Sequence, residues 1–159
     1  SLVSKTAGVA DGTLFNYFET KDELINAVYL VIKQEVAAQL LDGLSSLPSF
    51  KDKMWQIWSR YIDWGVAHPD KFKVLRQIGE SAALDPEVEA KCLELFNEIA
   101  RISHESIVKN EIRPYPEDYL AALVDQQSSM TVEYIAATQD KQTDYKQIGF
   151  DILWNGLIR

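Results

Sequence analysis

The sequence has few of the residues that usually mark catalytic, metal or disulfide-stabilised sites. It has a single cysteine, Cys92, which excludes an internal disulfide framework and fits a reducing cytoplasm. Its two histidines, His68 and His104, form no Glu-x-x-His or His-x-x-x-His ligand pair. Seven glycines are too sparse for a loop that cradles phosphates. We therefore expect no enzyme, no cofactor and no metal site.

Long apolar runs, strand patterns and repeats are also missing. No apolar run approaches the roughly 18 residues of a membrane span, and no signal peptide is visible. The chain shows no period-two alternation, no repeat, no low-complexity tract and no flexible interdomain linker. These absences predict a cytoplasmic all-α protein with no membrane partner.

Positive charge is scarce as well. Sixteen basic residues against 24 acidic residues give a net charge of −8, which is unusual for a protein that binds nucleic acid. The hydrophobic fraction of 47% is that of a soluble globular protein with a substantial core. The charge therefore argues against DNA binding, and only a specific motif could outweigh it.

Such a motif is present in the run GVADGTLFNYFETK, at residues 8–21. Gly8 can take the positive φ that a turn after a helix requires. Between Asp11 and Phe18, the apolar residues Leu14 and Phe18 lie four apart on one helix face. The polar side chains on the remaining surface are those of Thr13, Asn16 and Tyr17. An eight-residue helix is roughly 12 Å long and fits a B-DNA major groove of about that width.

A new helix is predicted to begin directly after this short helix. Thr20, followed three residues later by Glu23, forms a capping-box pattern that starts a helix at Lys21. Because a helix N-terminus attracts anions, Lys21 is well placed to meet a phosphate.

These residues resemble the signature of the TetR family of bacterial transcription regulators. The matching positions are Ala7, Gly8, Val9, Gly12, Thr13, Leu14, Tyr17, Phe18, Lys21 and Leu24. The resemblance covers about the first 30 residues. It implies a helix-turn-helix head followed by an all-helical ligand-binding and dimerising domain. We place this boundary at residue 44, which gives a head and connecting helix over 1–44 and a body over 45–159.

The resemblance also implies DNA-contacting roles for Gly12, Thr13, Asn16, Tyr17 and Lys21. The hydroxyls of Thr13 and Tyr17 match positions that hold the phosphate backbone, as does Lys21. Asn16 occupies a variable position that reaches base edges, and an Asn side chain pairs well with adenine. Three departures, Ala10, Asp11 and Phe15, weaken the phosphate grip. The chain begins within the motif, so we expect it to lack the family's first helix and part of the second, and to bind DNA poorly in this form.

The remainder reads as successive helices with short breaks. We expect helices from Lys21 to about Leu44, from Ser49 to before His68-Pro69, from Asp70 to Ala83, and a long helix capped by Asp85 that continues toward Asn110. Two final helices are expected at Glu117 to Gln139 and Asp144 to Ile158.

Aromatic residues on the second of these helices suggest a ligand cavity. Trp55, Trp58, Tyr61 and Trp64 follow one another at spacings of three residues. Ordinary core or interface packing would explain the same residues. The functional interpretation is a pocket for an unknown small-molecule effector, with candidate lining residues Trp58, Tyr61, Phe96, Ile99, Gln126, Gln127 and Met130.

The last helix carries a possible self-association face. Gly149 and Gly156 lie seven residues apart with Ile152 and Leu153 between them, which permits close helix packing. Packing against the chain's own body would explain the same pattern. The family resemblance favours a homodimer through the last two helices, which would read a near-palindromic operator.

The sequence thus predicts a ligand-responsive DNA-binding transcription regulator, most simply a repressor that an effector releases from double-stranded DNA. Two alternatives stay open. One is a helical small-molecule-binding protein that has lost DNA binding, which Asp11, Phe15 and the acidic balance would suit. The other is an enzyme with an unrecognised site.

Overall fold

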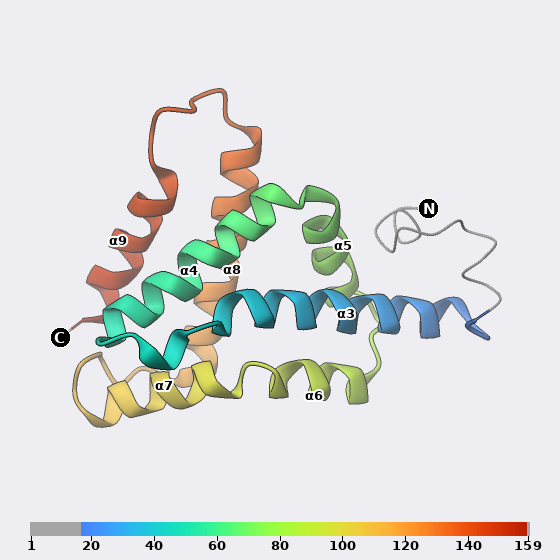
Figure 1. Ribbon diagram of the computed structural model, residues 1–159, viewed down its shortest axis with the longest axis horizontal. Helices are drawn as coiled ribbons and strands as arrows, with labels where there is room; N and C mark the ends of the chain where they lie inside the picture. Colours follow the sequence, from blue (N-terminus) through green and yellow to red (C-terminus); the bar gives the residue numbers. More distant parts are fainter. Residues whose placement is uncertain (1–16, 159) are drawn as a thin grey trace. The chain divides into compact units, whose positions relative to one another are not determined.

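The structure is a computed structural model that describes residues 17–158. Within this range the chain forms α-helices and a short 3-10 helix, and its only strand-like pairing is an isolated bridge between Ile112 and Ile158. The prediction of an all-α protein is confirmed (Figure 1). The elements are α3 (Lys21–Leu41), η1 (Leu44–Ser46), α4 (Phe50–Ala67), α5 (Pro69–Gly79), α6 (Pro86–Glu94), α7 (Asn97–Val108), α8 (Glu117–Ala137) and α9 (Tyr145–Leu157).

The helices group into two compact units that interleave along the sequence. Within the described residues, the first unit comprises 17–38 and 68–96, and the second comprises 39–67 and 97–158. Helices α5 and α6 fall in the same unit as most of the connecting helix α3, and the boundary at residue 44 stays a prediction.

In the first unit, a buried amide fastens α3 to the turn between α5 and α6. The Asn26 side chain donates from Nδ2 to the carbonyl oxygens of Asp22 and Ala83, at 2.8 Å each. Its Oδ1 accepts from the backbone N–H of Asp85 at 2.7 Å. Asp85 in turn caps α6 by accepting from the Glu87 N–H at 2.7 Å. Since both N–H donors and the oxygen of this amide are engaged, Asn26 favours one position of α3 on this turn.

The predicted long helix from Pro86 is broken. Helix α6 ends at Glu94, and α7 begins at Asn97. The N–H groups of Leu95 and Phe96 bond to carbonyls three residues back, at Cys92 and Leu93, which makes a tight turn. The sequence has no proline or glycine there, and the apolar spacing continues through the break, so periodicity alone could not reveal it.

The expectation that no segment approaches a membrane span is also corrected. Residues Lys21–Ser46 are long and apolar enough to cross a membrane by length and composition. The helix carries a buried stripe with four-residue spacing, and 44% of its most apolar window is buried. The stripe comprises Leu24, Val28, Ile32 and Val36. That burial is typical of a core helix of a soluble protein.

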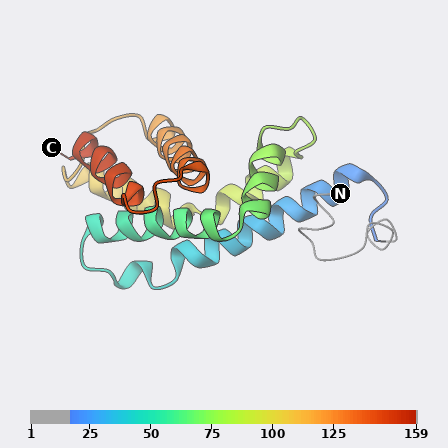
Figure 2. The same ribbon diagram turned by 90° about the horizontal axis from the view of Figure 1, so that it is seen from above.

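In the second unit, α4, α8 and α9 pack on one another, and α8 and α9 run side by side in both views (Figure 1 and Figure 2). Aromatic side chains fill the contact between α4 and α9. The Trp55 and Phe150 rings meet edge to face at a centroid distance of 5.0 Å. Phe150 also stacks on Trp154 at 6.2 Å, and Trp154 lies against Phe50 at 5.9 Å. Such pairs add to the stabilisation that comes from burying their area.

Candidate functional site

The DNA-contacting residues divide between the undescribed and the described parts of the chain. Gly12, Thr13 and Asn16 lie outside the described residues. Tyr17 is described and its side chain is 79% exposed, so its hydroxyl is accessible. Lys21 is exposed at the first residue of α3. Both side chains are available to a partner, and their roles in DNA binding stay predictions.

The start of α3 is capped much as the Thr20 and Glu23 pattern predicts. Thr20 Oγ1 accepts from the Glu23 N–H at 3.1 Å. The Glu23 carboxylate reaches back to the Glu19 N–H at 2.9 Å, one residue before the position that a standard capping box would use. Lys21 therefore stands on a fixed first turn, where the helix dipole also favours a nearby anion.

The predicted ligand-lining residues mainly serve packing, and Trp58 shows this most clearly. Its side chain is 2% exposed, and Nε1 donates to the Lys146 carbonyl oxygen at 2.8 Å. A β-carbon added to Gly149 would lie 2.7 Å from Trp58 Cζ2. Trp58 therefore joins α4 to α9, and Gly149 is the residue that allows this close approach.

The other candidates do not converge on one cavity. Tyr61 Oη lies 3.4 Å from Ser129 Oγ, and Gln127 Nε2 donates to the Gly149 carbonyl oxygen at 3.1 Å. Gln126 and Met130 are exposed on α8, and Ile99 is half-buried on α7. Phe96 belongs to the first unit, where the Lys33 ammonium lies 5.4 Å from its ring centroid.

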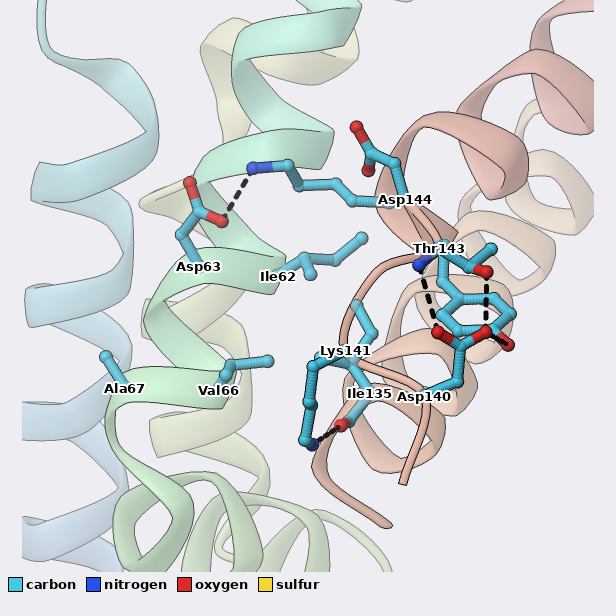
Figure 3. Close-up of a pocket in the computed structure, with 11 residues that line it drawn as sticks. Ile62, Asp63, Val66, Ala67, Ile135, Asp140, Lys141, Thr143 and Asp144 are labelled. Carbon is cyan, nitrogen blue, oxygen red and sulfur yellow. Dashed lines mark hydrogen bonds and ion pairs between the residues drawn. The ribbon is translucent and has the colours of Figure 1, made fainter. Parts of the chain in front are cut away.

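A cavity of about 350 Å³ lies elsewhere in the second unit, and it contains none of these seven residues. Its walls come from the last turns of α4 and α8, the following loop and the first turn of α9 (Figure 3). The apolar part is formed by Ile62, Val66, Ala67 and Ile135, and the polar part by Asp63, Asp140, Lys141, Thr143, Asp144, Tyr145 and Lys146. This volume falls within the range of small-molecule sites.

Asp140 organises the loop that forms one wall of this cavity. Its carboxylate accepts from the N–H groups of Gln142 and Thr143 at 3.0 and 3.1 Å. It also accepts from the Tyr145 hydroxyl at 3.0 Å. Hydrogen bonds led by those from Thr143 hold the pKa of Asp140 well below its usual range. The same carboxylate raises the pKa of Tyr145.

The sequence predicted a break between the last two helices here, but not the cavity that this loop lines. In the segment TQDKQTDY, at residues 138–145, two aspartates stand two and six residues after Thr138, a pattern typical of side-chain-capped turns. The pattern predicts a turn, but it does not reveal that α4 lies beside it. The cavity therefore becomes visible only in three dimensions.

The outer faces of α8 and α9 carry exposed apolar side chains. On α8, Tyr119, Leu123, Met130 and Tyr134 are 40–64% exposed and follow one helical stripe. On α9, Ile148 and Ile152 are 45% and 65% exposed. A β-carbon at Gly156 would meet none of residues 17–158 within 4 Å. We call these six apolar residues together with Gly156 the outer face.

Comparison with known proteins shows what this helical arrangement is similar to. Residues 1–28 match the family model of the bacterial regulatory proteins of the tetR family. The chain has the fold of a TetR-family transcription regulator. The resemblance drawn from the N-terminal motif is thereby confirmed, and the outer face lies on the last two helices of this TetR-family fold.

Solved structures of similar fold cover nearly the whole chain. One is a Shewanella sp. PV-4 protein assigned to the TetR family, with 24% identity, a TM-score of 0.82 and coverage of 100% of this chain and 87% of that one. Another is a TetR-family regulator from Marinobacter aquaeolei VT8, with 20% identity, a TM-score of 0.84 and coverage of 98% and 82%. A third is FadR from Bacillus subtilis in complex with stearoyl-CoA, with 18% identity, a TM-score of 0.70 and coverage of 96% and 85%.

Proposed function

We propose that this protein is a cytoplasmic, ligand-responsive transcription regulator that binds operator DNA as a homodimer, and that it acts as a repressor. The observation that carries the proposal is the match of residues 1–28 to the tetR-family model, together with a TetR-family fold in the rest of the chain. The exposed Tyr17 and Lys21 side chains, at the end of that matched segment and on the capped start of α3, suit contacts with phosphates.

The outer face supports the proposal of self-association. A soluble chain rarely leaves two adjacent helices with a shared apolar surface uncovered. A symmetric partner would cover the outer face with its own copy, giving a four-helix seam. The open space beside Gly156 supports this arrangement, because no described residue lies within 4 Å of the position that a β-carbon would take.

Ligand response requires that the effector bind the DNA-competent and DNA-incompetent states with different affinities. The Asn26 hydrogen bonds support a route for such a response. They tie α3, which begins three residues after Phe18, to the turn between α5 and α6. A shift of this turn would move α3 with it. The FadR structure shows that a protein of this fold holds stearoyl-CoA, which supports ligand binding without identifying the effector here.

The direct test is selection of bound DNA from a random pool by the full-length protein. We expect enrichment of a defined sequence by the wild type, and loss of enrichment by the double variant Tyr17→Ala, Lys21→Ala. A matched control is Lys73→Ala on α5, another exposed lysine outside the N-terminal segment, which should enrich the same sequence. Failure of the wild type to enrich any sequence would instead favour a helical ligand-binding protein without DNA function, which the net charge of −8 would suit.

A further inference from the structure

The cavity at the ends of α4 and α8 combines an apolar wall with an excess of negative charge. Ile62 and Val66 point from α4 toward the loop that carries Asp140 and Lys141 (Figure 3). The lining has three carboxylates, those of Asp63, Asp140 and Asp144, and two ammonium groups. An apolar wall favours a ligand with an apolar part. The excess of carboxylates in the lining determines which charge is favoured on the polar group of that ligand.

Both ammonium groups are already engaged within the chain. Lys146 Nζ lies 2.8 Å from Asp63 Oδ1, and Lys141 Nζ donates to the Ile135 carbonyl oxygen at 3.0 Å. Asp144 Oδ1 accepts from the Gln147 N–H at 3.0 Å. The second oxygens of Asp63 and Asp144 have no hydrogen-bond partner among residues 17–158. Acceptors therefore remain available, and the surplus charge is negative.

The ends of the neighbouring helices also favour a positively charged ligand. Helix α4 ends at Ala67 and α8 ends two residues after Ile135, so the C-termini of both helices lie near the cavity. The C-terminus of a helix favours cations. The N-terminus of α9 would favour an anion, but the Asp144 carboxylate already caps it. The low pKa of Asp140 keeps that carboxylate charged as well.

We propose that this cavity binds a small amphipathic organic cation, with its ammonium group beside Asp63 and Asp144 and its apolar body against Ile62, Val66 and Ile135. We assign this cavity as the effector site, which gives the chemical class of the effector and rests on the proposed function. The binding itself does not depend on DNA, so a regulator that failed this test would still be a regulator.

The test is an NMR titration of the isotope-labelled full-length protein with three probes of similar size. These are benzyltrimethylammonium, benzyl alcohol and phenylacetate, which carry a positive charge, no charge and a negative charge. We expect saturable shifts of the Ile62, Val66 and Ile135 methyl signals with the cation, and at least about tenfold weaker binding of the anion. The proposal is overturned if phenylacetate binds as tightly as the cation, or if the cation gives no saturable shift.

Two variants locate the effect in this cavity. Asp63→Asn removes one lining charge from a side chain that is 63% exposed, so the fold should persist while cation binding weakens by about threefold to fivefold. Val66→Trp fills the apolar wall and should abolish binding. Asp151→Asn, which changes an exposed carboxylate outside the cavity on α9, should leave binding unchanged. Equal losses with Asp63→Asn and Asp151→Asn would contradict the assignment.

Discussion

The inner and outer faces of α9 have similar composition and opposite surroundings. On the inner face, Phe150 and Leu153 are 2% and 5% exposed, and Gly149 lets Trp58 approach the backbone. On the outer face, Ile152 is 65% exposed, and a β-carbon added to Gly156 would meet no side chain or backbone of the described part of the chain within 4 Å. An apolar helix face that its own chain leaves uncovered calls for a partner. The contrast teaches that the inner face stabilises the protomer, whereas the outer face is available for assembly.

The largest effect is expected from breaking the inner contact at its centre. Trp58→Ala removes a side chain that is 2% exposed and leaves the Lys146 carbonyl without its indole donor. We expect a loss of about 3–5 kcal/mol in the free energy of unfolding. Denaturant titration followed by circular dichroism measures it. A loss below about 1 kcal/mol would show that α9 does not depend on this contact.

The next effect concerns the outer face. Ile152→Glu places a negative charge in the proposed dimer interface. In a symmetric dimer each protomer carries the substitution, so the interface would contain two such charges. We expect the dimer to weaken by about 2–4 kcal/mol, measured by analytical ultracentrifugation. Val108→Glu on α7 is the matched control, because Val108 is 67% exposed and lies off the outer face. If the Ile152→Glu variant dimerises as tightly as the wild type, α9 does not lie in the dimer interface.

A pair of glycine substitutions compares the two faces most closely. Gly149→Ala places a β-carbon 2.7 Å from Trp58 Cζ2, so we expect a loss of about 1–3 kcal/mol in the free energy of unfolding. Gly156→Ala has open space and should stabilise the isolated protomer by up to about 1 kcal/mol through helix propensity. Thermal unfolding of both variants at low protein concentration measures the change in protomer stability that each substitution causes. Equal changes in the free energy of unfolding would contradict the distinction between the inner and outer faces of α9.

The smallest effect is expected at the loop between α8 and α9. Because the folded pKa of Asp140 is lowered, its contribution to stability is complete above its unfolded value of about 3.9. It is lost as pH falls toward the folded pKa. The difference in melting temperature between wild type and Asp140→Asn should therefore narrow below about pH 4. A difference that stays constant from pH 6 to acid would show that this carboxylate is not linked to folding.

Much of the fold could be predicted from local sequence rules. Periodicity located α4, α8 and α9, Pro86 and Asp85 marked the start of α6, and Thr20 marked the start of α3. These signals act within a few residues of the chain. The break after Glu94 has no local signal, since its hydrogen bonds replace those of a helix without a proline or glycine.

The candidate site was harder to predict because it depends on contacts between distant segments. Trp58 is of a residue type that often lines ligand pockets. Its hydrogen-bond acceptor, the Lys146 carbonyl oxygen, lies 88 residues away in the sequence, and this contact makes Trp58 a packing residue. Asp63 reads as an ordinary exposed carboxylate until Lys146 is found 2.8 Å away. Neither partner can be derived from spacing along the chain, whereas the N-terminal motif could be recognised because its residues are contiguous.

The most direct test of the account is the arrangement of sites in DNA selected by the full-length protein. A dimer joined through the outer face should select two inverted half-sites whose centres lie about 10 base pairs apart, or a multiple of one helical turn. The Ile152→Glu variant should lose this pairing and retain at most a weak single half-site. Selection of no sequence, or of one unpaired site by the wild type, would contradict a dimeric DNA-binding regulator.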